Sequence, residues 1–142
     1  MQQTLRTLER IREHQERIAR VNFVEVRSRR DEAVDDLGAL QRRLSLLQTE
    51  RSTDTSDVAR HHLFAVQMEM VRRQKAAGLE QMDHDLADAQ ARWNTARQST
   101  RKVTRLAEIA EERTAREQAK KDAKELDEAG RMAWWKGQGE AV

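Results

Sequence analysis

The chain contains no proline in its 142 residues, and this absence constrains the fold more than any other feature. Proline inside a helix costs about 3 kcal/mol, because it removes a backbone donor and clashes with the preceding turn. Charged residues make up 37% of the sequence and aromatic residues only 4%, a composition typical of long helices that pair along an apolar stripe. We therefore expect an all-α protein. Disorder is the alternative for any highly charged chain, but apolar residues at helical spacing disfavour it.

One short segment, Ser52–Asp57, has the composition of a turn. Its hydroxyl and carboxylate side chains compete for backbone hydrogen bonds and favour a helix start, with Asp54 or Ser56 as the N-cap. The segment predicts two long helices that fold back on each other in an antiparallel coiled-coil hairpin. We expect one domain over residues 1–142, with no second fold unit.

The two predicted helices differ in length, and the second is the longer. The expected bounds are 3–51 for the first helix, 52–57 for the turn, 58–134 for the second helix and 135–142 for a flexible tail. Past about residue 106 the second helix has no intrachain partner, which leaves a C-terminal overhang of about 40 Å. The folding-back predicts three opposed pairs, which are Leu40 with Met68, Val26 with Met82 and Leu5 with Val103.

Apolar residues recur in steps of three and four, the spacing that keeps one helix face apolar. In the second half of the first helix they are Val26, Ala33, Leu37, Leu40, Leu44 and Leu47. In the second helix they are Leu79, Met82, Leu86, Ala89, Trp93, Ala96, Thr100, Val103, Ala107 and Ala110. The first half of the first helix is less regular, with Leu5, Leu8, Ile11, Ile18, Val21 and Phe23. That drift indicates a stutter or a weaker seam.

Two apolar rows compete at the start of the second helix. One contains Phe64, Met68, Val71 and Lys75, and the other contains Leu63, Val66 and Met70. Both rows cannot face the first helix. Either the buried face is wide near the turn, or one row docks on another protein.

The sequence offers no constellation for catalysis or metal binding. The four histidines (His14, His61, His62 and His84) show no i, i+4 pair, and there is no cysteine, so a metal site lacks its usual ligand spacing. We expect no enzyme activity, no metal and no cofactor. No apolar run approaches the roughly 18 residues of a membrane span, and there is no signal core, so we expect a cytoplasmic protein.

Two further features have competing interpretations. Residues 1–30 hold eight arginines against four glutamates; a solvated helix face or an acidic protein partner explains them better than nucleic acid, which needs a clustered basic patch. Trp93 occupies a seam position and is expected in the core. Trp134 and Trp135 are adjacent and cannot both face one seam, so they either cap the end of the rod or anchor a partner.

The sequence resembles the flagellar type III export protein family FliJ. The resemblance covers essentially the whole chain, and its best anchor is the charged run Arg116–Glu128, in which Leu126 is followed by Asp-Glu. Trp93 and Phe64 also match aromatic positions of the family. The short turn and the terminal tryptophan pair depart from it.

The resemblance implies a non-enzymatic central stalk of the flagellar export apparatus, which serves flagellum assembly and hence motility and chemotaxis. Such a stalk inserts into the hexameric export ATPase ring, promotes ring assembly, binds the cytoplasmic domain of the export gate and recycles export chaperones. It reaches the cytoplasmic face of the inner membrane only through these partners. A generic coiled-coil chaperone or scaffold, or an injectisome stalk, is the alternative.

The resemblance also implies two sets of contact residues. For the export gate they are Phe64, Met68, Val71 and Lys75 near the turn, with Leu40, Arg43 and Leu47 as counterparts on the first helix. For the ATPase ring they are Arg113, Arg116, Lys120, Lys121, Lys124 and Leu126 on the overhang.

Overall fold

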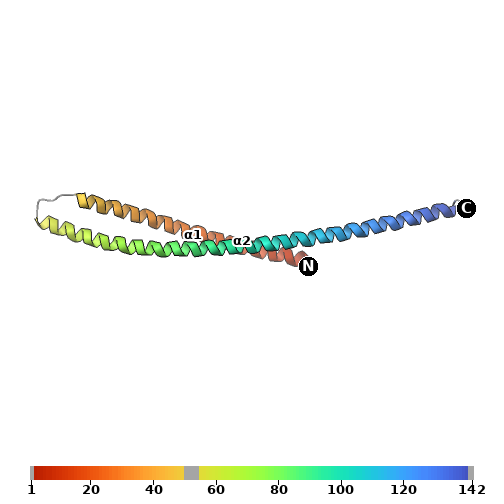
Figure 1. Ribbon diagram of the computed structural model, residues 1–142, viewed down its shortest axis with the longest axis horizontal. Helices are drawn as coiled ribbons and strands as arrows, with labels where there is room; N and C mark the ends of the chain where they lie inside the picture. The colour runs from red at the N-terminus through yellow and green to blue at the C-terminus, as the bar shows by residue number, and fades with distance from the viewer. Residues whose placement is uncertain (1, 50–54, 141–142) are drawn as a thin grey trace. The chain divides into compact units, whose positions relative to one another are not determined.

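The computed structural model describes residues 2–49 and 55–140, and both segments are helical. Helix α1 is Gln2–Thr49, with 48 residues, and helix α2 is Thr55–Glu140, with 86 residues (Figure 1). Neither described segment contains a strand. The prediction of an all-α chain with a longer second helix is confirmed.

The observed helix ends differ from the expected ones. Helix α2 begins at Thr55, so Ser56 lies inside the helix and is not its cap. Asp54, the other predicted cap, lies outside the described residues, as do Arg51 and the rest of the predicted turn before it.

The expected flexible tail from residue 135 is wrong, because α2 continues to Glu140. Gly137 and Gly139 lie in this last part of the helix, and no glycine among the described residues has a positive φ. Each glycine costs about 1 kcal/mol in a helix relative to alanine. The last turns of α2 therefore have little intrinsic helix propensity.

The chain divides into two compact units. One contains α1 up to Glu13 together with α2 from Gln98, and the other is His14–Arg97. Each unit is a pair of helix segments, and each is described by itself below.

The segments in His14–Arg97 run antiparallel, since rising residue numbers on α1 meet falling numbers on α2. Phe23 packs against Trp93 with ring centroids 5.2 Å apart, and Arg30 Nε donates a hydrogen bond of 2.7 Å to Asp83. Near the end of α1, His61 lies against the carbonyl of Leu47. An antiparallel pair of this kind buries one stripe from each helix.

The predicted seam of α2 is confirmed at every position, since all ten of its residues are buried or half-buried. The seam in the second half of α1 is confirmed as well. Leu40 and Leu44 are its most buried members, and the other four are half-buried. The core of these units is therefore a single row of side chains from each helix.

In the first half of α1 the expected seam is confirmed at Leu5, Leu8 and Phe23, which are half-buried, and is wrong at the other three positions. Ile11, Ile18 and Val21 are about half exposed or more. Between Leu8 and Phe23 the half-buried positions are Glu9, Arg12, Glu16, Ala19 and Asn22. Two successive steps of four, from Leu8 to Arg12 to Glu16, replace the alternation of three and four, and this is the spacing of a stutter.

At two of the three expected pairs the register between the helices differs by about one helical turn, whereas the His61–Leu47 contact agrees with the register that the pair Leu40–Met68 implies. Arg30, not Val26, pairs with the neighbourhood of Met82, because Arg30 bonds to Asp83. In the other unit Glu9, not Leu5, lies opposite the neighbourhood of Val103, since Thr104 donates to Glu9.

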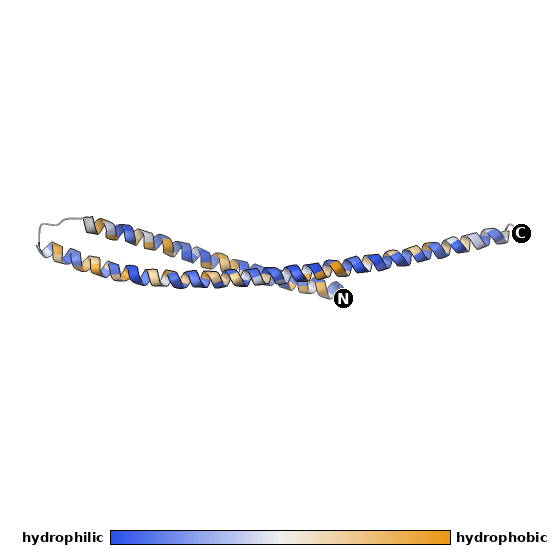
Figure 2. Cartoon of the chain, in the orientation of Figure 1, coloured by the Kyte–Doolittle hydropathy of each residue, from blue (hydrophilic) through white to orange (hydrophobic). Residues whose placement is uncertain are grey.

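The unit that contains α2 from Gln98 onwards has only a short partner segment from α1. Gln2 Nε2 reaches the carbonyl of Ala110 at 3.4 Å, and every residue from Glu111 to Gly139 is exposed. In the hydropathy colouring this part of α2 is largely hydrophilic (Figure 2). The overhang thus begins about five residues later than expected, as the shifted register requires.

Candidate functional site

An open groove runs along one edge of the helix pair in His14–Arg97. It consists of two adjoining hollows of about 350 Å³ and 220 Å³, which share Asp36 and Lys75. The other lining residues are Ala33, Ala39, Leu40, Arg42, Arg43 and Leu46 on α1, and Gly78, Leu79 and Met82 on α2. Gly78 has no atom within 4 Å of the position that a Cβ would occupy, so the groove is open beside it.

The groove has an apolar floor and charged walls. Leu40, Leu79 and Met82 come from the two seams and present their accessible edges to it. Arg42, Arg43 and Lys75 outnumber the single carboxylate of Asp36 among the charged lining residues. Apolar contact combined with positive charge suits an amphipathic segment that carries carboxylates.

The groove gathers three of the seven residues expected to bind the export gate, namely Leu40, Arg43 and Lys75. Leu40 is only 9% exposed, so most of its side chain belongs to the core and only its edge is accessible. Leu47 is half-buried and accepts a hydrogen bond at its carbonyl oxygen from Nε2–H of His61. Its backbone therefore has a structural role at the end of α1.

The two apolar rows at the start of α2 both remain largely exposed. The inward positions here are His61, Ala65, Met68 and Arg72, all half-buried. Phe64, which is 45% exposed, and Val71 lie beside this inward face. They are on the same side of α2 as Lys75, because residues spaced by seven and eleven share one helix face. Leu63, Val66 and Met70 are exposed on the side of α2 that faces away from α1.

The expected gate-binding row is therefore continuous with the groove along one edge of α2. Of its four members only Met68 points mainly towards α1. Phe64 and Val71 offer apolar surface, and Lys75 offers a charge where the groove begins. The wide buried face that was the alternative interpretation is not formed.

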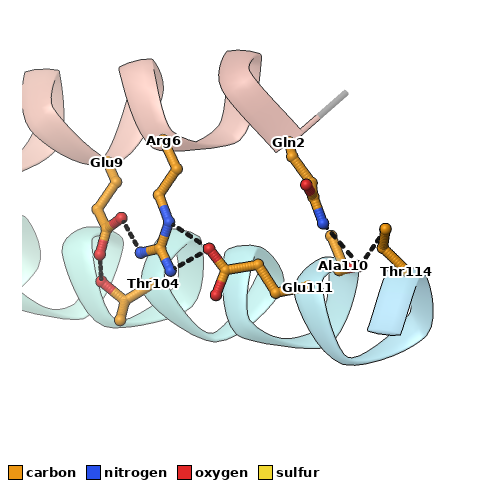
Figure 3. Close-up of polar contacts among 7 residues, drawn as sticks. All are labelled: Gln2, Arg6, Glu9, Thr104, Ala110, Glu111 and Thr114. Atoms are coloured by element: carbon orange, nitrogen blue, oxygen red, sulfur yellow. Dashed lines mark hydrogen bonds and ion pairs between the residues drawn. The ribbon is translucent and has the colours of Figure 1, made fainter. Parts of the chain in front are cut away.

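A polar network in the other unit holds the start of α1 on α2 (Figure 3). Arg6 donates to Glu111 through Nε at 2.8 Å and also through a second guanidinium nitrogen. Its remaining nitrogen donates to Glu9 at 2.6 Å, and Thr104 donates its hydroxyl to the other oxygen of Glu9 at 3.0 Å. We call Arg6, Glu9, Thr104 and Glu111 the clasp.

Hydrogen bonding in the clasp shifts the pKa values of two residues, Glu9 and Arg6. The hydrogen bond from Arg6, followed by the one from Thr104, lowers the pKa of Glu9 below its usual value. The pKa of Arg6 is raised, first by its hydrogen bond to Glu111 and then by that to Glu9. Both shifts favour the charged forms, as expected when hydrogen bonds are made to the ionised groups.

Beyond the clasp α2 is unpaired and carries the residues expected to contact the ATPase ring. Arg113, Arg116, Lys120, Lys121 and Lys124 are all exposed. Leu126 is 73% exposed. The set is fully accessible to a partner.

The tryptophan pair lies within the helical end of α2. Trp134 and Trp135 meet edge to face, with ring centroids 5.9 Å apart, and both are exposed. They therefore cap no core formed by the described residues. Anchoring of a partner, the other interpretation, stays a prediction.

The clasp and the Arg30–Asp83 pair are contacts that the sequence did not single out. The sequence feature that could have revealed them is a charged residue at a position that faces the other helix. Arg30 and Glu9 fall on the half-buried face of α1, where an apolar residue is expected. A charged residue in a seam position points to a specific partner across the interface.

Other kinds of site find no support in the described segments. Residues 2–49 and 55–140 contain no group of three or more histidine or acidic side chains arranged to hold a metal ion. Neither α1 nor α2, over its described length, has an apolar stretch long enough to cross a bilayer.

Comparison with known protein families gives one match. The family model of the flagellar FliJ protein matches residues 1–139, nearly the whole chain. No curated protein and no solved structure matches significantly. The antiparallel helix pairs and the longer second helix agree with the stalk-like hairpin that the resemblance implies. The chain therefore belongs to the FliJ family and is a component of the flagellar type III protein export apparatus.

Proposed function

We propose that this chain is the central stalk of the flagellar export ATPase complex and couples the ATPase ring to the export gate. The single observation that carries the proposal is the family match over residues 1–139. The stalk is non-enzymatic, works at the cytoplasmic face of the inner membrane through its partners, and recycles export chaperones.

The exposed end of α2 supports the ring contact. From Glu111 to Gly139 the helix has no intrachain cover, so it can enter a channel of modest width. Arg113, Arg116, Lys120, Lys121 and Lys124 supply charge, and Leu126 supplies one apolar contact. Exposed charges bind weakly and reversibly at physiological salt, which suits a stalk that must release its ring.

The edge formed by the groove and by Phe64 and Val71 supports the gate contact. It combines apolar surface with the positive charges of Arg43 and Lys75. Apolar side chains at the centre of an interface supply most of its binding energy, and charged residues at the rim supply orientation.

A binding experiment with the export-gate cytoplasmic domain tests the gate contact. Replacing Phe64 and Val71 together by Ala should weaken binding, because it removes exposed apolar surface from the edge, while the far-UV circular dichroism stays helical. The matched control is Leu63→Ala with Met70→Ala, which removes apolar area from the other side of α2. Equal loss from both double variants would contradict the assignment of the edge.

A second experiment tests the ring contact by charge reversal. Changing Lys120, Lys121 and Lys124 together to Glu should reduce stimulation of the export ATPase more than it reduces binding to the gate domain. Equal losses in the two assays would argue against separate contact surfaces. No ATPase stimulation by the unmodified chain would favour a coiled-coil chaperone or scaffold instead.

A further inference from the structure

The unpaired part of α2 carries an ordered pattern that the stalk function does not need. Small and apolar residues recur in steps of four and three on one face: Ala119, Ala123, Leu126, Gly130, Ala133 and Gly137. Every one of them is exposed, and Leu126 is the bulkiest. This face, which we call the C-terminal seam, has the heptad spacing of a helix that packs on another helix.

Intrinsic propensity does not explain why the last part of α2, from Gly130 onwards, is helical. Three glycines and two adjacent tryptophans fall between Gly130 and Glu140, and glycine weakens a helix by about 1 kcal/mol each. A helix of this composition is stabilised mainly by packing. No residue of the described α1 covers it, since the contacts of α1 end at Glu111.

The charges beside the C-terminal seam identify the partner. One flank carries Arg113, Lys120, Asp127 and Trp134, each seven residues after the last. In an antiparallel pair of identical helices this flank faces its own copy. When Ala123 of one copy packs against Leu126 of the other, Lys120 lies beside Asp127 and Arg113 lies beside Trp134.

The two-fold symmetry of such a pair repeats each contact. Two opposite-charge pairs and two cation–π contacts therefore form. No two residues of like charge lie opposite each other on this flank. A parallel pair is disfavoured by the same residues, because it places Asp122 of one copy beside Asp127 of the other. Within one chain Lys120 and Asp127 have no ion pair among the described contacts.

From this pattern we propose that two copies of the chain associate weakly through the C-terminal seams of α2, antiparallel, with Lys120 of each copy paired to Asp127 of the other. The seam is built mostly of alanine and glycine, so the backbones approach closely but little apolar area is buried. The association is therefore reversible. It covers the surface that the proposed function assigns to the ATPase ring, so a self-associated chain and a ring-bound chain exclude each other.

Sedimentation equilibrium of the chain alone over a range of concentrations tests the proposal. The unmodified chain should show a monomer–dimer equilibrium. Lys120→Glu and Asp127→Lys should each raise the dissociation constant at least about threefold, because each loses two ion pairs and gains two repulsions. The double variant carrying both changes should recover the original value. Lys121→Glu and Glu128→Lys make the same charge changes on the opposite side of the helix and should have no effect.

Cysteine cross-linking checks the direction of the pair, since the chain has no cysteine of its own. Ala119 of one copy lies next to Gly130 of the other in the proposed register. A mixture of the Ala119→Cys and Gly130→Cys proteins should form a disulfide-linked dimer, while each protein alone should link poorly. A cysteine fits at Gly130, where no atom lies within 4 Å of a Cβ.

Three results would overturn the proposal. They are a chain that stays monomeric at all concentrations, a dimer unaffected by both single charge reversals, and tighter association of the Asp127→Lys variant, which would indicate parallel helices. None of them bears on the proposed function, because every measurement uses the chain without the ATPase or the gate.

Discussion

Arg6 on α1 holds Glu111 on α2 through two nitrogens of its guanidinium group, with Nε 2.8 Å from the carboxylate. Among the hydrogen bonds between the described parts of the two helices, this one reaches furthest along α2. The pair thus marks where the exposed part of α2 begins. Exposed ion pairs contribute little to global stability, but this one has a local effect because it holds a helix end.

The Arg6→Ala variant should release the first turns of α1 without unfolding the chain. Backbone amides of residues 2–9 should exchange with solvent faster, and the thermal transition should change little. Arg101→Ala removes an exposed arginine of α2 that makes no contact across the helices and is the matched control. Unchanged exchange in residues 2–9 would show that the clasp does not hold this end.

Packing against the seam should matter far more than apolar character alone. Leu44 is 8% exposed, while Leu46 on the same helix is 66% exposed. Leu44→Ala should lower the free energy of unfolding by about 2–4 kcal/mol, because it leaves a cavity in a single-row core. Leu46→Ala should change it by about 0.5 kcal/mol or less. Chemical denaturation measures both, and similar values for the two would contradict the observed facing of α1.

Much of this packing could be predicted from the sequence. Heptad steps identified the α2 seam from Leu79 to Ala110 and the apolar members of the α1 seam from Val26 to Leu47, because apolar periodicity indicates which face is buried. They did not identify the inward positions before Leu79, such as His61 and Arg72. The irregular half of α1 could not be predicted in this way. Ile11 and Ile18 are more apolar than Arg12 and Glu16, yet the latter two lie inwards. A stutter changes which residues of the helix face the partner helix, whether those residues are apolar or charged.

Register and helix ends were harder to predict for a related reason. Heptads repeat, so sliding one helix along the other by about one turn keeps leucines against leucines. Specific pairs such as Arg30 with Asp83 select among these registers, and they became visible only in the structure. Glycine near the C-terminus suggested a disordered tail, yet α2 continues to Glu140.

Reversing the charges of the Arg30–Asp83 pair tests this selection of register. Arg30→Asp and Asp83→Arg should each lower the thermal midpoint, because each places like charges across the interface. The double exchange should recover part of the loss. Val26→Asp with Met82→Arg, the pair expected from the sequence, should show no such recovery, because those residues do not lie opposite each other.

Substitutions of Trp93 compare the contribution of ring packing to stability with the contribution of its indole N–H. Its ring stacks on Phe23, and Arg97 lies 5.2 Å from the ring centroid. Its indole nitrogen is buried and has no hydrogen-bond partner among the described residues. Trp93→Phe keeps the stacking and removes an unpaired donor, so its cost should be small. Trp93→Ala should cost about 3–5 kcal/mol. Equal costs in denaturation would show that the indole nitrogen does have a partner.

Acid should release the start of α1 through Glu9. The hydrogen bonds from Arg6 and Thr104 lower the pKa of Glu9 in the folded chain. A group with a lowered folded pKa stabilises the fold at pH above its unfolded value, and this stabilisation is lost as the pH falls through the folded pKa. Amide exchange of residues 2–9, corrected for the intrinsic pH dependence of exchange, should therefore show full protection near neutral pH and reduced protection below the usual glutamate range. In Glu9→Gln the protection should be lower at neutral pH and should lose most of its acid dependence. If Glu9→Gln instead kept the full acid response, Glu9 would not be the group that controls the release.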